Sequence, residues 1–320
     1  MEKKIKKAFF ELSRNSRITT KELSKKIKTT QQSASYLLNR MKKRRMLTNF
    51  NAMIDPARFG LTNVVVGYNF LDFTYKTKKE IWNEFYSCDS VISIQESSFK
   101  TDVIVEYSVN NLSAFNKMHS EIIQKFHAVL EPRLILPVIV KHYYDRKYLV
   151  KRSTTSDMIL CGDRDIYNLS LNEYRVLIQL LKNPVGRYVD IAGQTSISAK
   201  TVINIKNKLI KEKIIKGFSC TPNLSNMELN RHIILLKLSG LGIGQTRELN
   251  NFCKVNKNII CFIKTIGEFQ VMLVVEELQK NNIIRELRSR FMIQDFFMVE
   301  VENIRKNQSL PQSVLTEDYF

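Results

Sequence analysis

The sequence predicts an α+β protein in which two small helical domains alternate with two domains of alternating strands and helices. Three observations predict this: the apolar pattern of the first half recurs in the second, basic residues concentrate at the start of each repeat, and strand-like and helix-like periodicities alternate in the rest. The repeat runs at one constant offset, without a gap, from about Ile18 to Glu106, so that Leu23 falls on Ile191 and Met41 on Leu209. Identities are few, so preserved spacing indicates an internal duplication.

The positive charge lies almost entirely in two short segments. The chain carries a formal net charge of +19. Residues 1–50 hold 15 Lys or Arg against three acidic residues, and residues 169–222 hold nine against three. Charge concentrated in this way raises the local potential toward a polyanion, so it predicts a nucleic-acid partner.

The basic part of each repeat has the pattern of a winged helix-turn-helix. Apolar residues at helical spacing predict helices over residues 3–13, after a cap at Thr19 or Thr20, and over Gln31–Arg45. The β-prone segments Met46–Phe50 and Ala52–Ile54 are expected to form the wing. The second repeat predicts the corresponding segments Leu171–Leu181, Tyr188–Gly193, Ser198–Lys213 and Ile214–Cys220.

The remainder of each repeat predicts a ferredoxin-like βαββαβ domain. In the first repeat the segments are Val64–Phe70, Thr77–Tyr86, Val91–Gln95, Asp102–Ser108, Leu112–Phe126 and Ile135–Tyr143. In the second they are Ile233–Leu238, Thr246–Val255, Ile259–Lys264, Gln270–Glu276, Asn281–Phe291 and Asp295–Val301.

These patterns predict six regions. They are a winged helix-turn-helix over 1–55, a βαββαβ sensor and dimerisation domain over 58–148, a Ser/Thr-rich linker over 149–168, a second winged helix-turn-helix over 169–222, a second βαββαβ domain over 229–305 and a poorly ordered tail over 306–320.

The segment Ile197–Phe218 resembles the recognition helix and wing of the leucine-responsive (Lrp/AsnC) transcription regulators, and Thr29–Phe50 is similar to it more loosely. Asp55–Leu61 resembles the connector into that family's βαββαβ ligand-sensing domain, known as the RAM domain. The resemblance implies a transcription regulator that binds double-stranded DNA, is modulated by an amino acid or a related small effector, and associates through its sheet domains. Because two copies are fused here, the sheet domains are expected to pair within the chain or between chains.

Short polar side chains at the start of a recognition helix reach base edges, and cations around it contact phosphates. In the first copy we expect base contacts from Thr30, Gln31, Gln32, Ser33, Ser35 and Tyr36, and phosphate contacts from Lys28, Arg40, Lys42, Lys43, Arg44 and Arg45. In the second copy we expect base contacts from Ser198, Lys200, Thr201 and Asn204, and phosphate contacts from Lys206, Lys208 and Lys216.

The family's effector site carries a G-x-x-D motif in the turn between the second and third strands. Phe99–Asp102 keeps the aspartate and loses the glycine, whereas Gly267–Gln270 keeps the glycine and loses the acid. The resemblance therefore makes Asp102, Gly267 and Gln270 the candidate effector residues, with a changed ligand or none.

Two other function classes stay open. Siroheme decarboxylases resemble this architecture. For that function we would expect basic residues in the sheet domains, whereas here the basic excess lies in the helical domains. His119, His127, His142 and His232 lack metal-ligand spacing, so we expect no catalytic residues, no metal and no cofactor. The same basic helices would also suit RNA binding or chromosome architecture.

Five cysteines, none in a C-x-x-C arrangement, indicate reduced thiols. The longest aliphatic run, Leu134–Val140, is interrupted by Pro137 and is far shorter than the roughly 20 residues that span a bilayer. The chain opens with MEKKIKK and shows no secretory signal pattern, so we expect a cytoplasmic protein without a membrane partner.

Overall fold

The computed structural model describes residues 1–320 except 72–73, 99, 152–155, 240–241, 280–281 and 316–320. Some sequence predictions therefore fall outside the described residues: Phe99 of the expected effector motif, Asn281 at the start of an expected helix, and parts of the expected linker and tail.

The helical part of each repeat forms three helices, and their bounds correspond at the same offset that places Leu23 on Ile191. In the first repeat they are α1 (Lys3–Arg14), α2 (Thr20–Ile27) and α3 (Gln31–Lys43), and in the second α6 (Leu171–Lys182), α7 (Tyr188–Thr195) and α8 (Ala199–Lys211). Their starts follow from local chemistry, because Thr19 and Ser170 each form a capping box with the glutamate three residues later. Thr30 and Ser198 cap the third helices with their hydroxyls.

The expected wings are replaced by one shared ribbon. Residues of the first wing form a single strand, β1 (Leu47–Ile54), which pairs antiparallel with β7 (Ile215–Pro222) of the other repeat. Asn51 alone does not provide a tight turn, so the segment stays extended and pairs with the equally long strand of its counterpart. The prediction of two separate wings was therefore wrong, and the two helical domains are joined through their strands.

Arg17 adds to this junction. Its guanidinium donates hydrogen bonds to the carbonyl oxygens of Pro184 at 2.6 Å and Gly186 at 2.7 Å. It also stacks on the ring of Tyr188, 4.5 Å from the ring centre. These contacts link the first helical domain directly to the second.

The two βαββαβ units follow. The first contains β2 (Thr62–Phe70), α4 (Tyr75–Ser87), β3 (Val91–Ser98), β4 (Val103–Val109), α5 (Leu112–Phe126) and β5 (Leu130–Tyr144). The second contains β8 (Asn230–Leu238), α9 (Ile243–Val255), β9 (Ile259–Thr265), β10 (Val271–Glu277), α10 (Ile283–Arg288) and β11 (Ile293–Asn307). Short 3-10 turns occur at Pro56–Phe59, Lys147–Leu149 and Gln312–Leu315.

The long last strand of each unit joins the two sheets. β5 pairs with β2 of its own unit and with β9 of the other, and β11 pairs with β8 and with β3. Eight antiparallel strands thereby close into a ring in the order β2-β4-β3-β11-β8-β10-β9-β5. The predicted α+β fold is confirmed, and the two sheet domains pair within one chain.

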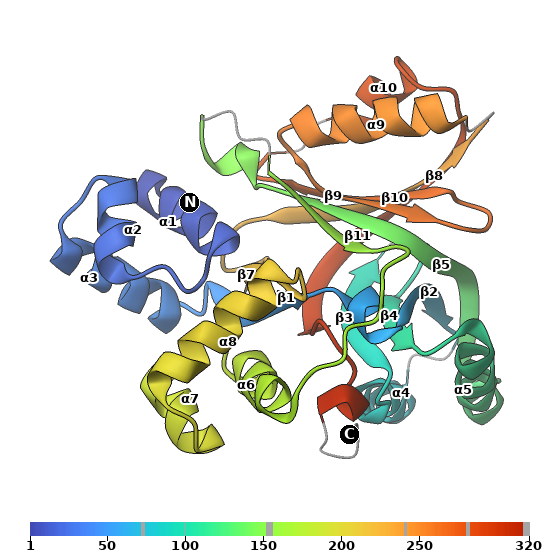
Figure 1. Cartoon of the computed structure of the whole chain (residues 1–320). Coiled ribbons are helices and arrows are strands. Elements are labelled where there is room, and N and C mark those ends of the chain that lie inside the picture. Colours follow the sequence, from blue (N-terminus) through green and yellow to red (C-terminus); the bar gives the residue numbers. More distant parts are fainter. Residues whose placement is uncertain (72–73, 99, 152–155, 240–241, 280–281, 316–320) are drawn as a thin grey trace.

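Helices cover the outer faces of this ring (Figure 1). α4 and α5 pack on the first sheet through side chains such as Phe85 and Phe115, and α9 and α10 pack on the second through Leu249 and Leu287. The inner faces of the two sheets are left to face each other and the β1–β7 ribbon. Any site enclosed by the fold must therefore be lined by both repeats.

Parts of two regions expected to be irregular are ordered among the described residues. Within the expected linker, β6 (Asp157–Cys161) pairs with β5. Asp55 fixes this strand, because its Oδ1 accepts a hydrogen bond of 2.8 Å from the Cys161 amide. In the expected tail, Leu310 and Val314 are buried against the second helical domain, which gives this polar segment a packing partner that the sequence pattern did not reveal.

Candidate functional site

A cavity of about 910 Å³ lies between the β1–β7 ribbon and the inner faces of the two sheets. Residues of β3, β4, β5, β6, β9, β10 and β11 line it, together with the end of α1 and the segment after β1. Ligand pockets in proteins commonly enclose about 300–1,000 Å³, so this cavity is large enough for a sizeable organic molecule.

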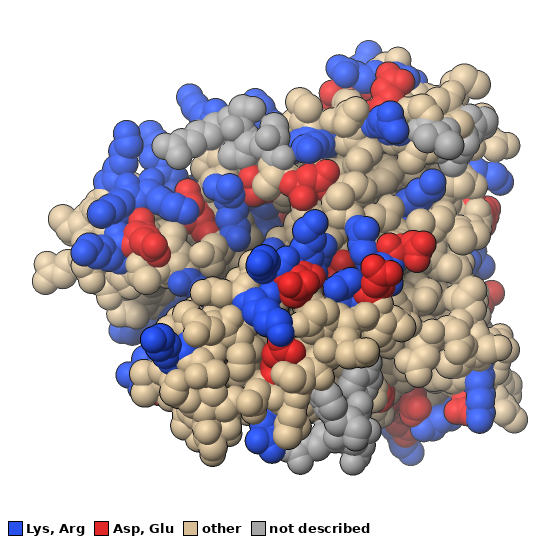
Figure 2. All heavy atoms as spheres, in the orientation of Figure 1, with Lys and Arg blue, Asp and Glu red and all other residues tan. Residues whose placement is uncertain are grey.

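The cavity wall is rich in cations. Nine Lys or Arg residues line it, against five Asp or Glu residues. Lysine, arginine and acidic side chains also lie next to one another across the middle of the molecular face in Figure 2. The cations are Arg14, Lys26, Arg58, Lys141, Arg146, Arg164, Lys213, Lys216 and Arg231.

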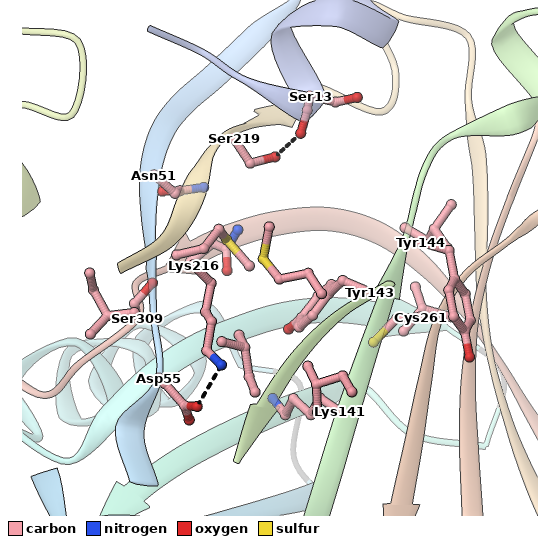
Figure 3. Close-up of a pocket in the computed structure, with 18 of the residues that line it drawn as sticks. Ser13, Asn51, Asp55, Lys141, Tyr143, Tyr144, Lys216, Ser219, Cys261 and Ser309 are labelled. Carbon is pink, nitrogen blue, oxygen red and sulfur yellow. Dashed lines mark hydrogen bonds and ion pairs between the residues drawn. The ribbon is translucent and has the colours of Figure 1, made fainter. Parts of the chain in front are cut away.

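Lys216 enters the cavity from β7 and pairs with the buried Asp55. The Lys216 Nζ lies 3.3 Å from Asp55 Oδ2 (Figure 3). Arg164 approaches the same oxygen at 3.9 Å. Two cations therefore share one carboxylate oxygen, which leaves a local excess of positive charge available to an anionic ligand.

Lys141 enters from β5, where its side chain is 5% exposed, and it forms an ion pair with Glu106. Asn63 also donates a hydrogen bond to this carboxylate. Burial disfavours the ammonium charge, but the attraction of Glu106 outweighs it and raises the pKa of Lys141 above its usual value. Lys141 therefore stays protonated within the cavity wall.

Tyr143 points into the same space as Lys141 and Lys216, whereas the neighbouring Tyr144 points away (Figure 3). Tyr144 instead bonds to Asn250 of α9 through its hydroxyl. Burial raises the pKa of Tyr143 well above its ordinary value, although the nearby Lys141 ammonium acts in the opposite direction. The Tyr143 hydroxyl is protonated at neutral pH, as an ordinary tyrosine is, and can donate a hydrogen bond to a ligand.

A buried ion cluster forms another part of the wall. Glu276 is fully buried and accepts hydrogen bonds from Arg146 at 2.7 Å and Arg231 at 3.1 Å. Tyr148 donates a further bond of 2.8 Å to it. Burial opposes the charge of Glu276, but the two guanidinium groups lower its pKa to about 2. This cluster holds the segment after β5 against the second sheet.

Several buried polar atoms of the wall have no hydrogen-bond partner among the described residues. They include Asn63 Oδ1, Gln95 Oε1 and Asp145 Oδ2. Leaving a buried polar group unsatisfied costs about 1–3 kcal/mol, so such atoms indicate a place that a ligand or water completes. The cavity thus combines size, charge and unused hydrogen-bonding capacity.

The side chains expected to read bases lie on exposed parts of α3 and α8. Tyr36 is 69% exposed, and Gln31, Gln32, Ser33 and Ser35 lie beside it on or near the surface. In the second copy Ser198, Lys200, Thr201 and Asn204 also lie at the surface. Gln32, Ser33 and Tyr36 line a separate surface groove of about 420 Å³ beside α3. None of these side chains lines the large cavity.

Several residues expected to contact phosphate have partners within the chain. Arg40 pairs with Glu2, Lys208 lies 2.7 Å from Glu173, and Lys206 lies 3.2 Å from the Tyr188 hydroxyl. Lys216 lines the cavity instead of an outer surface. The others, Lys28, Lys42, Lys43, Arg44 and Arg45, are exposed around α3, where nucleic-acid contact stays a prediction.

The candidate effector residues close the two sheet hairpins. Asp102 Oδ2 accepts a hydrogen bond of 2.8 Å from the Phe70 amide, and Gln270 Oε1 accepts the equivalent bond of 3.0 Å from Leu238. Gly267 adopts a φ of +125°, a conformation that glycine adopts more easily than other residues. These residues lie outside the lining of the large cavity, and an effector role for them stays a prediction.

Sequence reasoning missed most of the cavity residues. Lys141 and Tyr143 stood inside an expected strand, and Asp55, Arg146 and Arg164 lay at expected domain borders. A usable signal was the alternation of Lys141, Tyr143 and Asp145 along β5 and the residue that follows it. Polar residues at a spacing of two on a buried strand indicate a polar interior.

The four histidines lie outside this cavity. His119 is buried against Phe115, and His142 pairs with Asp157 at 2.9 Å on the side of β5 that faces Phe262. Among the described residues there is no group of three or more His, Cys, Asp or Glu side chains placed to hold a metal ion. Within the same residues, no helix has the length and apolar character needed to cross a membrane.

Comparisons with known proteins give a full-length match at the level of fold. A crystal structure of the siroheme decarboxylase NirDL matches with a TM-score of 0.60 and 8% identity, covering 98% of this chain and 96% of that one. A structure of the same enzyme with an iron-uroporphyrin III analogue matches with a TM-score of 0.57 and 9% identity, covering 99% and 95%. AsnC of E. coli matches 42% of this chain and 91% of its own, with a TM-score of 0.35 and 15% identity.

No protein-family model and no curated protein matches the sequence. The structural matches correct two expectations. The full-length similarity in fold is to an enzyme. The expectations that this chain is a DNA-binding transcription regulator, and that it is not an enzyme, were therefore wrong. What the comparisons establish is the tandem α+β fold, which this chain shares with NirDL over its full length.

Proposed function

We propose that this protein is a decarboxylase that acts on a carboxylate-bearing tetrapyrrole such as siroheme, and that the large cavity is its active site. The observation that carries the proposal is the cation-lined cavity, enclosed by both repeats of a fold shared along its full length with siroheme decarboxylase. The location of the basic residues supports it. The sequence pattern indicated positive charge in the helical domains, but Lys216, Lys213 and Arg14 of those domains line the cavity together with Lys141 and Arg231 of the sheet domains.

The residues present suit such a substrate. A tetrapyrrole is a broad ring that needs an extended cavity, and its carboxylate side chains need cations around the rim. Lys216 and Arg164 share a single carboxylate, and Lys213 is exposed at the edge of the cavity. We assign these three side chains to binding substrate carboxylates, since lysine and arginine form strong charge-assisted hydrogen bonds with such groups.

Decarboxylation breaks the bond between a carboxylate and its neighbouring carbon. The carboxylate leaves as CO2, the bonding electron pair remains on that carbon and is spread into the conjugated ring, and one proton must be delivered to it. We assign this proton to the Tyr143 hydroxyl, which points into the cavity beside Lys141. The charge of Lys141 favours the phenolate that remains after the proton has left, and so acts against the effect of burial on the pKa of Tyr143. Solvent then restores the proton of Tyr143.

The test is to incubate the purified full-length chain with siroheme without oxygen and to follow loss of CO2 from the tetrapyrrole by mass spectrometry. The Tyr143→Phe variant should bind siroheme normally but turn it over at least about 100-fold more slowly, the usual contribution of a general acid. Tyr144→Phe is the matched control, because its hydroxyl bonds to Asn250 of α9 instead of facing Lys141 and Lys216. Unchanged siroheme after incubation with the wild-type chain would refute the proposed reaction.

A further inference from the structure

Four cations of the cavity wall belong to chain segments that meet at one carboxylate, that of Asp55. Asp55 is fully buried, and its amide donates a hydrogen bond of 3.0 Å to the backbone carbonyl between Lys213 and Lys216. Arg58 follows Asp55 in a 3-10 turn, and Arg164 follows β6. All four cations line the cavity, so three segments bring positive charge to the surroundings of a single acid.

Asp55 holds its cations loosely. Its Oδ1 is fixed by the hydrogen bond of 2.8 Å from the Cys161 amide. Its Oδ2 lies 3.3 Å from Lys216 Nζ and 3.9 Å from Arg164 Nε, but it accepts no hydrogen bond from the described residues. Four other cations of the wall do donate a hydrogen bond to a carboxylate, namely Arg14, Lys141, Arg146 and Arg231. The ion pairs of Asp55 can therefore separate without the loss of a directed hydrogen bond.

This part of the wall also offers unused donors. Arg58 Nε is buried and has no hydrogen-bond partner among the residues that the structure describes, although Nη1 of the same guanidinium donates a bond of 2.6 Å to the Asp165 carbonyl. Lys213 is exposed at the edge of the cavity. A buried donor without an acceptor destabilises the fold until an acceptor arrives. Such donors suit a ligand carboxylate, whose oxygens only accept hydrogen bonds.

The acid and two of its cations are replaced together in the other repeat. At the offset of the repeat, their counterparts are neutral: Asn223 for Asp55, Asn226 for Arg58 and Thr48 for Lys216. The backbone bond is nevertheless retained, because the Asn223 amide donates a hydrogen bond of 2.9 Å to the Met46 carbonyl. The fold at this point therefore forms without these charges, which indicates that they serve a ligand.

The further step rests on the proposed function. We infer that Asp55 is a resident counterion, which holds Lys216 and Arg164 in the absence of substrate and releases them to a carboxylate of the substrate. Without substrate, the charge of Asp55 limits the repulsion among the cations around it. When substrate binds, Lys216 and Arg164 donate hydrogen bonds to the substrate carboxylate, while Asp55 keeps its bond to the Cys161 amide. Asp55 thus competes with the substrate for the same two cations.

This exchange predicts opposite effects on stability and on affinity. Asp55→Asn keeps an oxygen for the Cys161 amide and removes the negative charge. The free energy of unfolding should fall, because the cations then repel one another without a counterion. The dissociation constant for iron uroporphyrin should also fall, by about tenfold, because no internal carboxylate competes for the cations. An acid that only supported the fold would lower stability without tightening binding.

The experiment is an absorbance titration of full-length variants with iron uroporphyrin. Asp190→Asn is the matched control, because Asp190 is an exposed acid of α7 outside the cavity. Its dissociation constant should stay within about twofold of the wild-type value. Lys216→Thr should raise the dissociation constant by about tenfold, since one cation is lost. If Asp55→Asn does not fold, the double variant Asp55→Asn, Lys216→Thr removes one charge of each sign and should bind more tightly than Lys216→Thr.

Circular dichroism and thermal unfolding check that each variant is folded. The inference is overturned if folded Asp55→Asn binds no more tightly than the wild type, or if the double variant binds no more tightly than Lys216→Thr. Tighter binding by Asp55→Asn, with siroheme left unchanged by the wild type, would support the exchange and refute the proposed reaction. Turnover of siroheme by the wild type without tighter binding by Asp55→Asn would refute the exchange alone. A wild-type chain that does not bind iron uroporphyrin would overturn both.

Discussion

The two sheet domains share their backbone and differ in the side chains that face the cavity. The hydroxyl of Ser97 donates to the carbonyl of Thr101 at 2.9 Å, and Thr265, its counterpart, donates to that of Phe269 at 2.7 Å. The side-chain hydrogen bond that closes this turn is thus retained in both copies. On the inner faces, by contrast, Glu106 in the first copy corresponds to Val274 in the second. The duplication therefore preserved the backbone and its turns, while the side chains on the inner faces of the two sheets diverged.

The largest expected effect comes from the ion cluster around Glu276, whose first-copy counterpart is Ser108. Replacing it by that counterpart, Glu276→Ser, would leave the guanidinium groups of Arg146 and Arg231 without their shared carboxylate. We expect the free energy of unfolding to fall by about 3–5 kcal/mol, measured by urea denaturation. Ser108→Ala, at the equivalent position of the first copy, should change it by less than about 1 kcal/mol. Equal effects in the two copies would contradict the asymmetry.

The pH dependence of the free energy of unfolding tests the same ion cluster around Glu276. The pKa of Glu276 is about 2 in the folded chain and 4.5 when unperturbed. Its contribution is fully present above about pH 4.5 and is lost as the pH falls toward about 2, because the unfolded chain then binds a proton that the folded chain does not. The difference corresponds to about 3 kcal/mol. Urea denaturation of the wild type across this pH range should show the free energy of unfolding falling by this amount. In Glu276→Ser the part of the fall that is due to Glu276 should be absent.

The ion pair of Lys141 and Glu106 can be converted into the residues of the second copy. Lys141 pairs with Ile263, and Ile304 pairs with Gln95, the counterpart of Ile263, so Lys141 corresponds to Ile304. Lys141→Ile installs the second-copy residue but leaves the carboxylate of Glu106 without its cation, so we expect a loss of about 2–3 kcal/mol in unfolding free energy. The double variant Lys141→Ile, Glu106→Val should recover most of that stability, since both partners are then apolar. It should still bind iron uroporphyrin more weakly than the wild type in an absorbance titration. A double variant with wild-type affinity would show that this pair does not contribute to binding.

The smallest effects are expected at the hairpin ends, where the copies act alike. Asp102→Ala removes one side-chain hydrogen bond to a backbone amide. Gln270→Ala removes the equivalent bond and two longer bonds that its Nε2 donates, at 3.2 Å, to the carbonyls of Gly267 and Glu268. Each should lower the free energy of unfolding by about 1 kcal/mol. Losses that differ by several-fold between the two variants would mean that the turns have diverged as the inner faces of the sheets have.

Local elements could be predicted from the sequence because their causes are local. Caps such as Thr30 and Ser198, together with the repeated apolar pattern, indicated the helices and most strands. The joining of β1 with β7, and the exchange of β5 and β11 between the sheets, could not be predicted. These pairings depend on which edges meet in three dimensions, and strand periodicity does not specify a partner.

The site could be predicted only in part for the same reason. Lys216 was expected to contact phosphate, and it does lie in a cationic region, but its partner Asp55 belongs to the other repeat. The distribution of charge along the sequence showed where the basic residues are concentrated. It did not indicate that some of their side chains face inward. β5 and β11 also correspond at a different offset from the rest of the repeat, which hid the equivalence of Lys141 and Ile304.

The most direct test of the central claim is the stoichiometry of tetrapyrrole binding to the full-length chain. A single cavity shared by two repeats predicts that an absorbance titration with iron uroporphyrin saturates at one equivalent per chain. Ser93 lines the cavity, so Ser93→Phe places an aromatic ring inside it. This variant should remain folded but lose the ability to bind iron uroporphyrin. Saturation at two equivalents, or full binding by Ser93→Phe, would contradict the assignment of this cavity as the tetrapyrrole site.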